Sequence, residues 1–177
     1  MRRLWINIHL FLAAFFLLPL IMMGTSGGLY LLGIKGAVEK TPVALSAAMA
    51  IDPSSTTLAD DIREILAANN IDHKFEYINT SGSTLITRPT SRTHYEFNLA
   101  KAEMSRAEPD LVKTMIELHK GHGPRLFKDL QKVMALGLLF VLLSGFWLGV
   151  SATGLRTQTL ITTALGGIVF VLLAFLL

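Results

Sequence analysis

Five histidines are the residues best suited to chemistry in this chain, and two of them lie close together near a glutamate. His119 and His122 are three positions apart and follow Glu117 closely. Three-residue spacing within a helix would place both imidazole rings on one face. Imidazole and carboxylate groups are ligands of zinc, so these residues are a candidate metal site. The simpler interpretation is an interfacial turn in which the imidazoles and nearby basic side chains meet lipid headgroups. We favour that interpretation and predict no metal.

A second group of chemically active residues combines two guanidinium groups with an imidazole. Arg88, Arg92 and His94 occur among threonines and serine in a short stretch after a β-branched run. These side chains could bind an anion, or a carboxylate of a partner protein, through charge-assisted hydrogen bonds. The alternative is an ordinary solvated loop. The three residues are the predicted partner-binding positions.

Several kinds of chemistry find no support in the sequence. The chain has no cysteine, which excludes disulfides, thiolate nucleophiles and iron–sulfur clusters. No serine lies in a nucleophile elbow, and no glycine-rich phosphate loop is present. Residues 35–132 hold all 13 acidic residues and 13 of the 16 lysines and arginines, so their net charge is zero and nucleic acid is an unsuitable partner. We predict no catalytic residue and expect a non-enzymatic protein.

Three long apolar segments must position these groups. Residues 10–34 contain no charged side chain, and residues 133–155 and 157–177 are two further charge-free runs separated only by Arg156. Each is long enough for a helix to cross a bilayer core of about 30 Å. The sequence thus predicts transmembrane helices at 4–34, 133–155 and 157–177, the last two forming a hairpin. Pro19 is expected to kink the first helix.

The basic residues flanking these segments predict an orientation. Arg2, Arg3 and Arg156 lie in short flanks, where the positive-inside rule applies, and we place them in the cytoplasm. The N-terminus is then cytoplasmic and residues 35–132 are extracytoplasmic, in the inner membrane of a bacterium. A competing interpretation treats the first segment as a cleaved signal peptide, but its apolar run resumes after the glycines near residue 27.

Glycines four positions apart mark faces on which the helices could approach one another. Gly24 and Gly28 form such a pair in the first segment, and Gly145 and Gly149 form one in the second. This spacing places two glycines on one helix face, as in helix-packing seams of membrane proteins. Glycine is also common in membrane helices without a packing role, so both interpretations stay open.

The middle segment has the pattern of a small α+β domain. Thr41 and Pro42 resemble the start of a helix reaching Ala50, and Thr57 is a possible cap for a second helix. Alternation then predicts three or four antiparallel strands. They are expected at residues 74–79, 84–87, 94–99 and 102–106, with a turn at 81–82 and a final helix over 110–120.

One block of residues resembles a known family. The sequence Leu-His-Lys-Gly-His-Gly at 118–123, followed by Ser-Gly-Phe-Trp-Leu at 144–148, is similar to the PepSY-associated transmembrane family. The basic N-terminus, His9 and the Thr-Ser-Gly-Gly-Leu-Tyr run at 25–30 agree with it, and residues 45–104 look like a PepSY domain. The resemblance implies an α-helical membrane protein with three transmembrane helices and a small extracytoplasmic α+β domain.

The resemblance also implies two functional hypotheses. Larger relatives have more spans and further membrane histidines, and some are siderophore-iron reductases that carry haem. Here His9 and His119 are expected near opposite membrane faces and cannot share one haem, although His122 could pair with Met22, Met23 or Met134. The primary hypothesis is therefore an accessory or interaction subunit without a cofactor, binding lipid and another envelope protein or a second copy of itself. The alternative is a haem-binding electron-transfer component with ligands at His9, His119 or His122.

Overall fold

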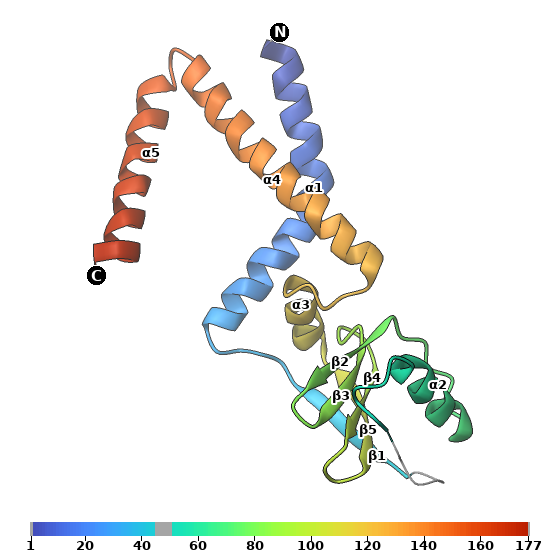
Figure 1. Cartoon of the computed structure of the whole chain (residues 1–177). Coiled ribbons are helices and arrows are strands. Elements are labelled where there is room, and N and C mark those ends of the chain that lie inside the picture. The colour runs from blue at the N-terminus through green and yellow to red at the C-terminus, as the bar shows by residue number, and fades with distance from the viewer. Residues whose placement is uncertain (1, 45–50, 177) are drawn as a thin grey trace. The chain divides into compact units, whose positions relative to one another are not determined.

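Long helices and a compact sheet domain make up the computed structural model, which describes residues 2–44 and 51–176 (Figure 1). Among these residues three helices are long and apolar enough to cross a membrane. They are α1 (Arg2–Leu31), α4 (Arg125–Ser151) and α5 (Arg156–Val171), which continues as a π-helical turn over Leu172–Leu176. The chain divides into two compact units, residues 1–18 with 132–177 and residues 19–131.

The first unit holds the start of α1 together with most of α4 and all of α5. Phe16 of α1 is only 3% exposed and lies directly against Gly137 of α4. Trp5 stacks on Phe140, with ring centroids 6.1 Å apart. Because apolar helices gain little hydrophobic energy from one another within lipid, close contacts of this kind are what hold a helix pair together.

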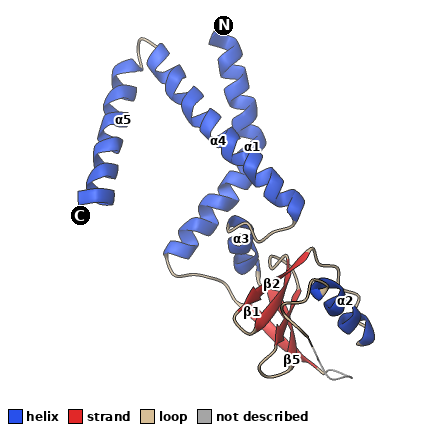
Figure 2. Cartoon of the chain, viewed as in Figure 1, coloured by secondary structure: helices blue, strands red, loops and turns tan. Residues whose placement is uncertain are grey.

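The second unit is built on a five-stranded antiparallel sheet with the order β1-β5-β4-β3-β2 (Figure 2). Its strands are β1 (Val38–Val43), β2 (Tyr77–Ser81), β3 (Thr84–Arg88), β4 (His94–Asn98) and β5 (Glu103–Pro109). Helix α2 (Leu58–Ala68) packs on one face and supplies Ile62 and Leu66 to a core with Leu85, Phe97 and Met104. Helix α3 (Leu111–His119) follows β5.

Because successive strand residues point to opposite faces, the strands that fill this core turn a second, more polar face away from α2. Asp110 fixes α3 at the end of that face, since its carboxylate accepts hydrogen bonds from the backbone N–H groups of Lys113 at 2.6 Å and Ala37 at 2.8 Å. Gly36 adopts a left-handed φ of +67°, and a side chain there would collide with the backbone of Lys113. The connection from α1 to the sheet therefore needs glycine at this position.

One predicted element is wrong. Thr41 and Pro42 do not start a helix but belong to β1, where Thr41 lies opposite Arg106 and Pro42 opposite Ser105 of β5. Residues 45–50 of that predicted helix lie outside the described residues. Proline is tolerated in β1 because the strand is at the edge of the sheet, where not every N–H group has a ladder partner.

The other elements of the domain are confirmed with shifted ends. The strand expected at 74–79 occupies 77–81, and the one expected at 102–106 extends to 109. Helix α2 follows Thr57, but the Thr57 side chain makes no capping hydrogen bond to the backbone. Helix α4 begins at Arg125, eight residues before the charge-free run. It therefore includes the charged residues that precede that run.

Candidate functional site

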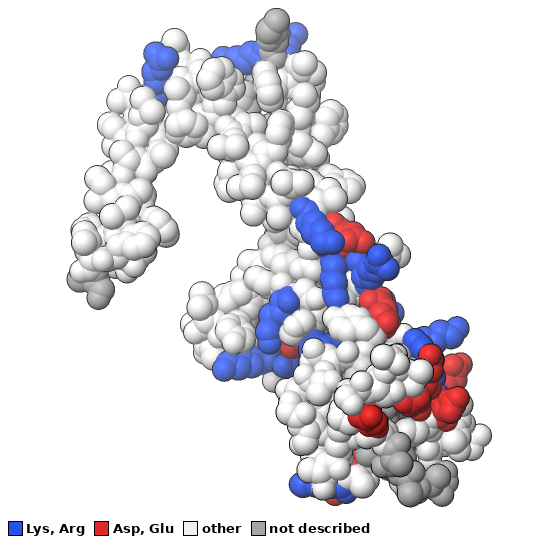
Figure 3. Space-filling model, in the orientation of Figure 1, with Lys and Arg blue, Asp and Glu red and all other residues white. Residues whose placement is uncertain are grey.

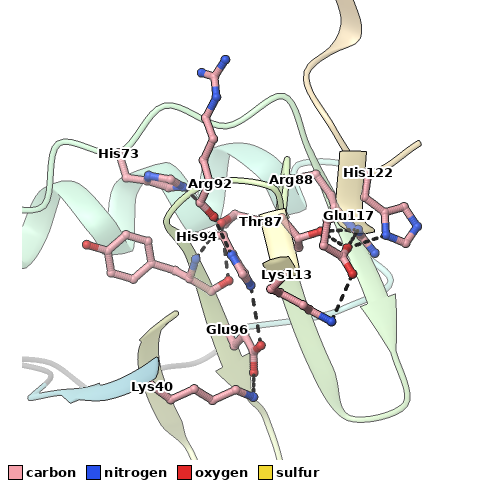
Figure 4. A network of polar contacts seen from close by, with 12 residues as sticks. Lys40, His73, Thr87, Arg88, Arg92, His94, Glu96, Lys113, Glu117 and His122 are labelled. Atoms are coloured by element: carbon pink, nitrogen blue, oxygen red, sulfur yellow. Dashed lines mark hydrogen bonds and ion pairs between the residues drawn. The ribbon is translucent and has the colours of Figure 1, made fainter. Parts of the chain in front are cut away.

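Glu117 of α3 is the centre of a buried polar cluster (Figure 4). The residue is 5% exposed although it carries a carboxylate. Its Oε2 atom accepts hydrogen bonds at 2.7 Å from Thr90 Oγ1 and from His122 Nδ1. Three cations surround it: Lys113 at 3.2 Å, Lys120 at 3.6 Å and Arg88 at 3.9 Å. The buried charge is thus compensated from several sides, as burial of a carboxylate requires.

Local structure explains how these groups converge on Glu117. Lys113 lies four residues before Glu117 and Lys120 three residues after it, so both side chains reach the same face of the helical segment. Gly121 then turns the chain with φ +76°, and the N–H of His122 donates to the Glu117 carbonyl at 2.9 Å. This turn brings the imidazole of His122 back beside the carboxylate.

A second carboxylate, Glu96 of β4, has partners on the same side of the sheet. Lys40 Nζ lies 2.5 Å from its Oε2 atom, and His94 Nε2 lies 3.7 Å from its Oε1 atom. His94 is 3% exposed, and its Nδ1–H donates to the carbonyl of Arg92 at 2.9 Å. That hydrogen bond orients the ring so that its other nitrogen faces Glu96.

The two clusters line one cleft of about 350 Å³ between the polar face of the sheet and α3. Its described lining residues include four cations but only two carboxylates: Lys40, Arg88, Lys113 and Lys120 against Glu96 and Glu117. Arg88 is mostly buried, its Nη1 atom donates to Thr90 at 2.8 Å, and its Nε atom has no hydrogen-bond partner among the described residues. An excess of positive charge and an unused guanidinium N–H favour an anionic ligand.

The same partners set the protonation of both carboxylates. Burial would raise the pKa of Glu117, but hydrogen bonds from Thr90, His122 and Lys113 outweigh it and lower the pKa to about 2. At Glu96 the neighbouring His94 is the largest cause of a pKa of about 2; Lys40 lowers it further, and burial opposes both. Groups with such pKa values hold no proton at neutral pH and are poorly matched to general acid–base catalysis.

His73 lies on the other face of the sheet and has a structural role. Its Nε2 atom lies 3.2 Å from Thr87 Oγ1, and its ring meets the ring of Tyr95 edge-on with centroids 4.9 Å apart. Burial lowers the pKa of His73, the neighbouring His94 lowers it further, and Asp72 partly opposes this shift. A neutral imidazole packed against an aromatic ring belongs with the core.

The predicted partner-binding residues are separated by the fold. Arg88 and His94 line the cleft, whereas Arg92 is exposed and extends away from both in Figure 4. Helix α3 ends at His119, so His122 lies beyond the helix and the expected common face with His119 does not form. Within the described residues no three His, Asp, Glu or Cys side chains are grouped so that they could hold a metal ion.

His9 and His119 have the same local arrangement in different helix pairs. His9 Nδ1 lies 2.9 Å from Ser144 Oγ, and His119 Nδ1 lies 2.9 Å from Ser26 Oγ. Each serine hydroxyl also donates to a backbone carbonyl in its own helix, at 3.1 Å. The imidazole therefore donates its Nδ1–H to the serine oxygen, and Nε2 is the ring nitrogen left for another contact. Each ring also lies against the glycine that follows the serine, Gly145 or Gly27.

The predicted glycine pairs differ in their surroundings. A Cβ atom added to Gly145 would lie 3.3 Å from His9, and one added to Gly149 would lie 2.6 Å from Thr159. A Cβ atom added to Gly24 or Gly28 would meet nothing within 4 Å among the described residues. Close contacts thus occur at the second pair.

Sequence reasoning missed four residues of the cleft: Lys40, Glu96, Lys113 and Lys120. A signal for part of the set was present, because Glu117 has a lysine at i−4 and another at i+3, a spacing that joins side chains on a helix. Alternation along β4 likewise places His94 and Glu96 on one face.

Comparison of the chain with protein-family models, with characterised proteins and with solved structures gave no match.

Proposed function

We propose that this chain is a non-enzymatic, membrane-anchored protein, similar to the PepSY-associated transmembrane family, that serves as an accessory or interaction subunit of an envelope complex. The three apolar helices anchor it in the bacterial inner membrane, with the N-terminus in the cytoplasm and the sheet domain outside. The 118–123 block and the following helix support the family, and the sheet packed on α2 is compatible with a PepSY domain.

The cleft between the sheet and α3 is the observation that carries this proposal. Four cations surround two carboxylates whose pKa values of about 2 keep them ionised, so the cleft is prepared for binding rather than for proton transfer. The ligand it fits best is an acidic side chain of another envelope protein. Arg88 and His94 remain the partner-binding residues predicted from sequence, joined by Lys40 and Lys120 at the rim.

Recovery of a partner with the tagged full-length chain tests this role. Lys40 and Lys120 are about half exposed, so replacing both with glutamine removes charge without opening the core. Loss of two charge-assisted hydrogen bonds should weaken partner binding by at least about tenfold. The matched control replaces the exposed Lys74 and Lys101, which do not line the cleft. Equal recovery with both double variants would contradict the proposed role of the cleft.

A haem-binding electron-transfer component is a second candidate, favoured by the arrangement of His9 and His119. A hydrogen bond at Nδ1 that orients the ring and leaves Nε2 available is typical of metal-bound histidine. Each ring fits the role of one axial ligand. His9 and His119 belong to different units and are expected near opposite membrane faces, so each haem would need its second ligand from elsewhere, such as a partner or a second copy. A Soret band in the purified protein, lost in His9→Ala or His119→Ala, would establish this alternative.

A further inference from the structure

A second concavity, separate from the cleft, lies in the same unit. This groove of about 530 Å³ is bordered by the loop between β3 and β4, by α3 and by the start of α4. Its wall is mostly apolar and includes Leu118, Leu126, Phe127 and Leu130, whereas Ser91 and Arg92 supply polar groups. Leu126 is 84% exposed, and together with Leu118, Phe127 and Leu130 it forms an apolar patch of the kind that marks a membrane or ligand contact.

The position of the groove along α4 limits what could cover it. Leu126, Phe127 and Leu130 belong to the first two turns of that helix. Leu130 precedes the charge-free run that starts at Val133 by about 4.5 Å of helix. Given the membrane insertion proposed above, on which this inference rests, the groove lies where α4 enters the headgroup region of the bilayer.

Ser91 is an independent observation that points to a ligand in the groove. The residue is 4% exposed, and its hydroxyl has no hydrogen-bond partner among the described residues. Buried polar groups are almost always paired, because an unpaired one has lost its water without replacement. Beside it, Arg92 is exposed and is directed away from the cleft that holds Arg88 and His94 (Figure 4). An apolar wall next to a hydroxyl and a guanidinium group matches a molecule with an apolar chain and an anionic head.

We propose that the groove binds one anionic phospholipid of the surrounding leaflet. An acyl chain lies against Leu126, Phe127 and Leu130. Arg92 binds the phosphate, and the Ser91 hydroxyl donates to an oxygen of the glycerol ester region. Figure 3 shows lysines and arginines together with acidic side chains over the second unit, so the attraction for an anionic lipid depends on Arg92 itself. A peptide could also fill an apolar groove. We favour lipid because the groove lies where α4 enters the headgroup region, so lipid molecules surround it.

Native mass spectrometry of the full-length chain, extracted from membranes and stripped of lipid in detergent, tests this site. The probes are phosphatidylglycerol and phosphatidylcholine, added separately. We expect one retained phosphatidylglycerol and weaker retention of phosphatidylcholine. Arg92→Gln should lower phosphatidylglycerol retention by about fivefold. Arg92→Lys should keep most of it, and Ser91→Ala should weaken it. Arg63→Gln, which removes an exposed arginine on α2 outside the groove, should leave it unchanged.

Two results would overturn the lipid site. One is equal retention of both lipids by the parent; the other is undiminished phosphatidylglycerol binding in Arg92→Gln and Ser91→Ala. A peptide retained in place of lipid would also contradict the choice of occupant. If the parent does not sediment with membranes, the proposed membrane anchoring fails together with the lipid site. A membrane-inserted parent without a preference for phosphatidylglycerol contradicts the lipid site alone.

Discussion

Glu117 is the residue on which most polar contacts of the cleft depend. Its carboxylate is buried among Lys113, Lys120 and Arg88, so Glu117→Ala leaves these cationic groups without their common partner. Removing one partner of a buried ion pair should lower the free energy of unfolding by about 3 kcal/mol. Chemical denaturation of the full chain in detergent measures this change. The control is Glu108→Ala, since Glu108 forms an exposed pair with Arg106 and should cost less than about 1 kcal/mol.

The low pKa values of Glu96 and Glu117 predict an acid-sensitive domain. Both groups have pKa values of about 2 in the folded chain, against an ordinary 4.5. A depressed folded-state pKa gives stabilisation that is complete above about pH 4.5 and is lost as the pH falls toward about 2. The melting temperature should therefore decrease over that window. The double variant Glu96→Gln/Glu117→Gln should show a shallower decrease, and an unchanged slope would rule out these two groups as its cause.

The cleft shows which parts of a site can be predicted from single residues. Lys113, Glu117 and Lys120 are linked by helical spacing alone, so the sequence contains that part of the cluster. Lys40 and Glu96 are joined only because β1 and β4 both pair with β5, and no local pattern reports such pairing. Part of the site is therefore readable from local spacing, and the rest requires the sheet.

At the scale of elements, glycine contacts predict which helix positions tolerate a side chain. Gly137 faces the ring of Phe16, and Gly149 faces Thr159, so alanine at either position must displace a packed side chain. Overpacking of this kind should lower stability by about 1–3 kcal/mol. Gly24→Ala is the matched control, because its Cβ would meet nothing within 4 Å among the described residues. Thermal unfolding in detergent measures the difference, and equal melting temperatures for all three variants would show that these contacts do not stabilise the helices.

Elements with strong apolar periodicity can be predicted from the sequence. The missed strand β1 shows why an element without such a pattern cannot. Helices α2 and α3 and four strands follow apolar spacing and turn residues that act locally. β1 contains Thr-Pro, a pair that is found at the start of helices as well as in edge strands. The strand is also exposed along most of its length, so it has no clear apolar alternation. Its pairing with β5, which follows it by some 60 residues of chain, decides the outcome.

Charge and apolar length divide the whole molecule into apolar helices and a polar domain. Three helices carry almost no charge beyond their ends, while residues 35–132 hold nearly all ionisable side chains, the cleft and the groove. Such a division suits a protein anchored by its helices that presents a binding domain to one side of a membrane. The cleft can meet an envelope partner only if that side is the extracytoplasmic one.

Labelling of single cysteines in intact cells tests on which side of the membrane the sheet domain lies. The chain has no cysteine, so Ser81→Cys at the end of β2 and Thr153→Cys between α4 and α5 each give one exposed thiol. A membrane-impermeant maleimide added from outside should label position 81 in intact cells and position 153 only after permeabilisation. Labelling of position 153 but not of position 81 from outside would contradict the account, because the sheet domain would then face the cytoplasm.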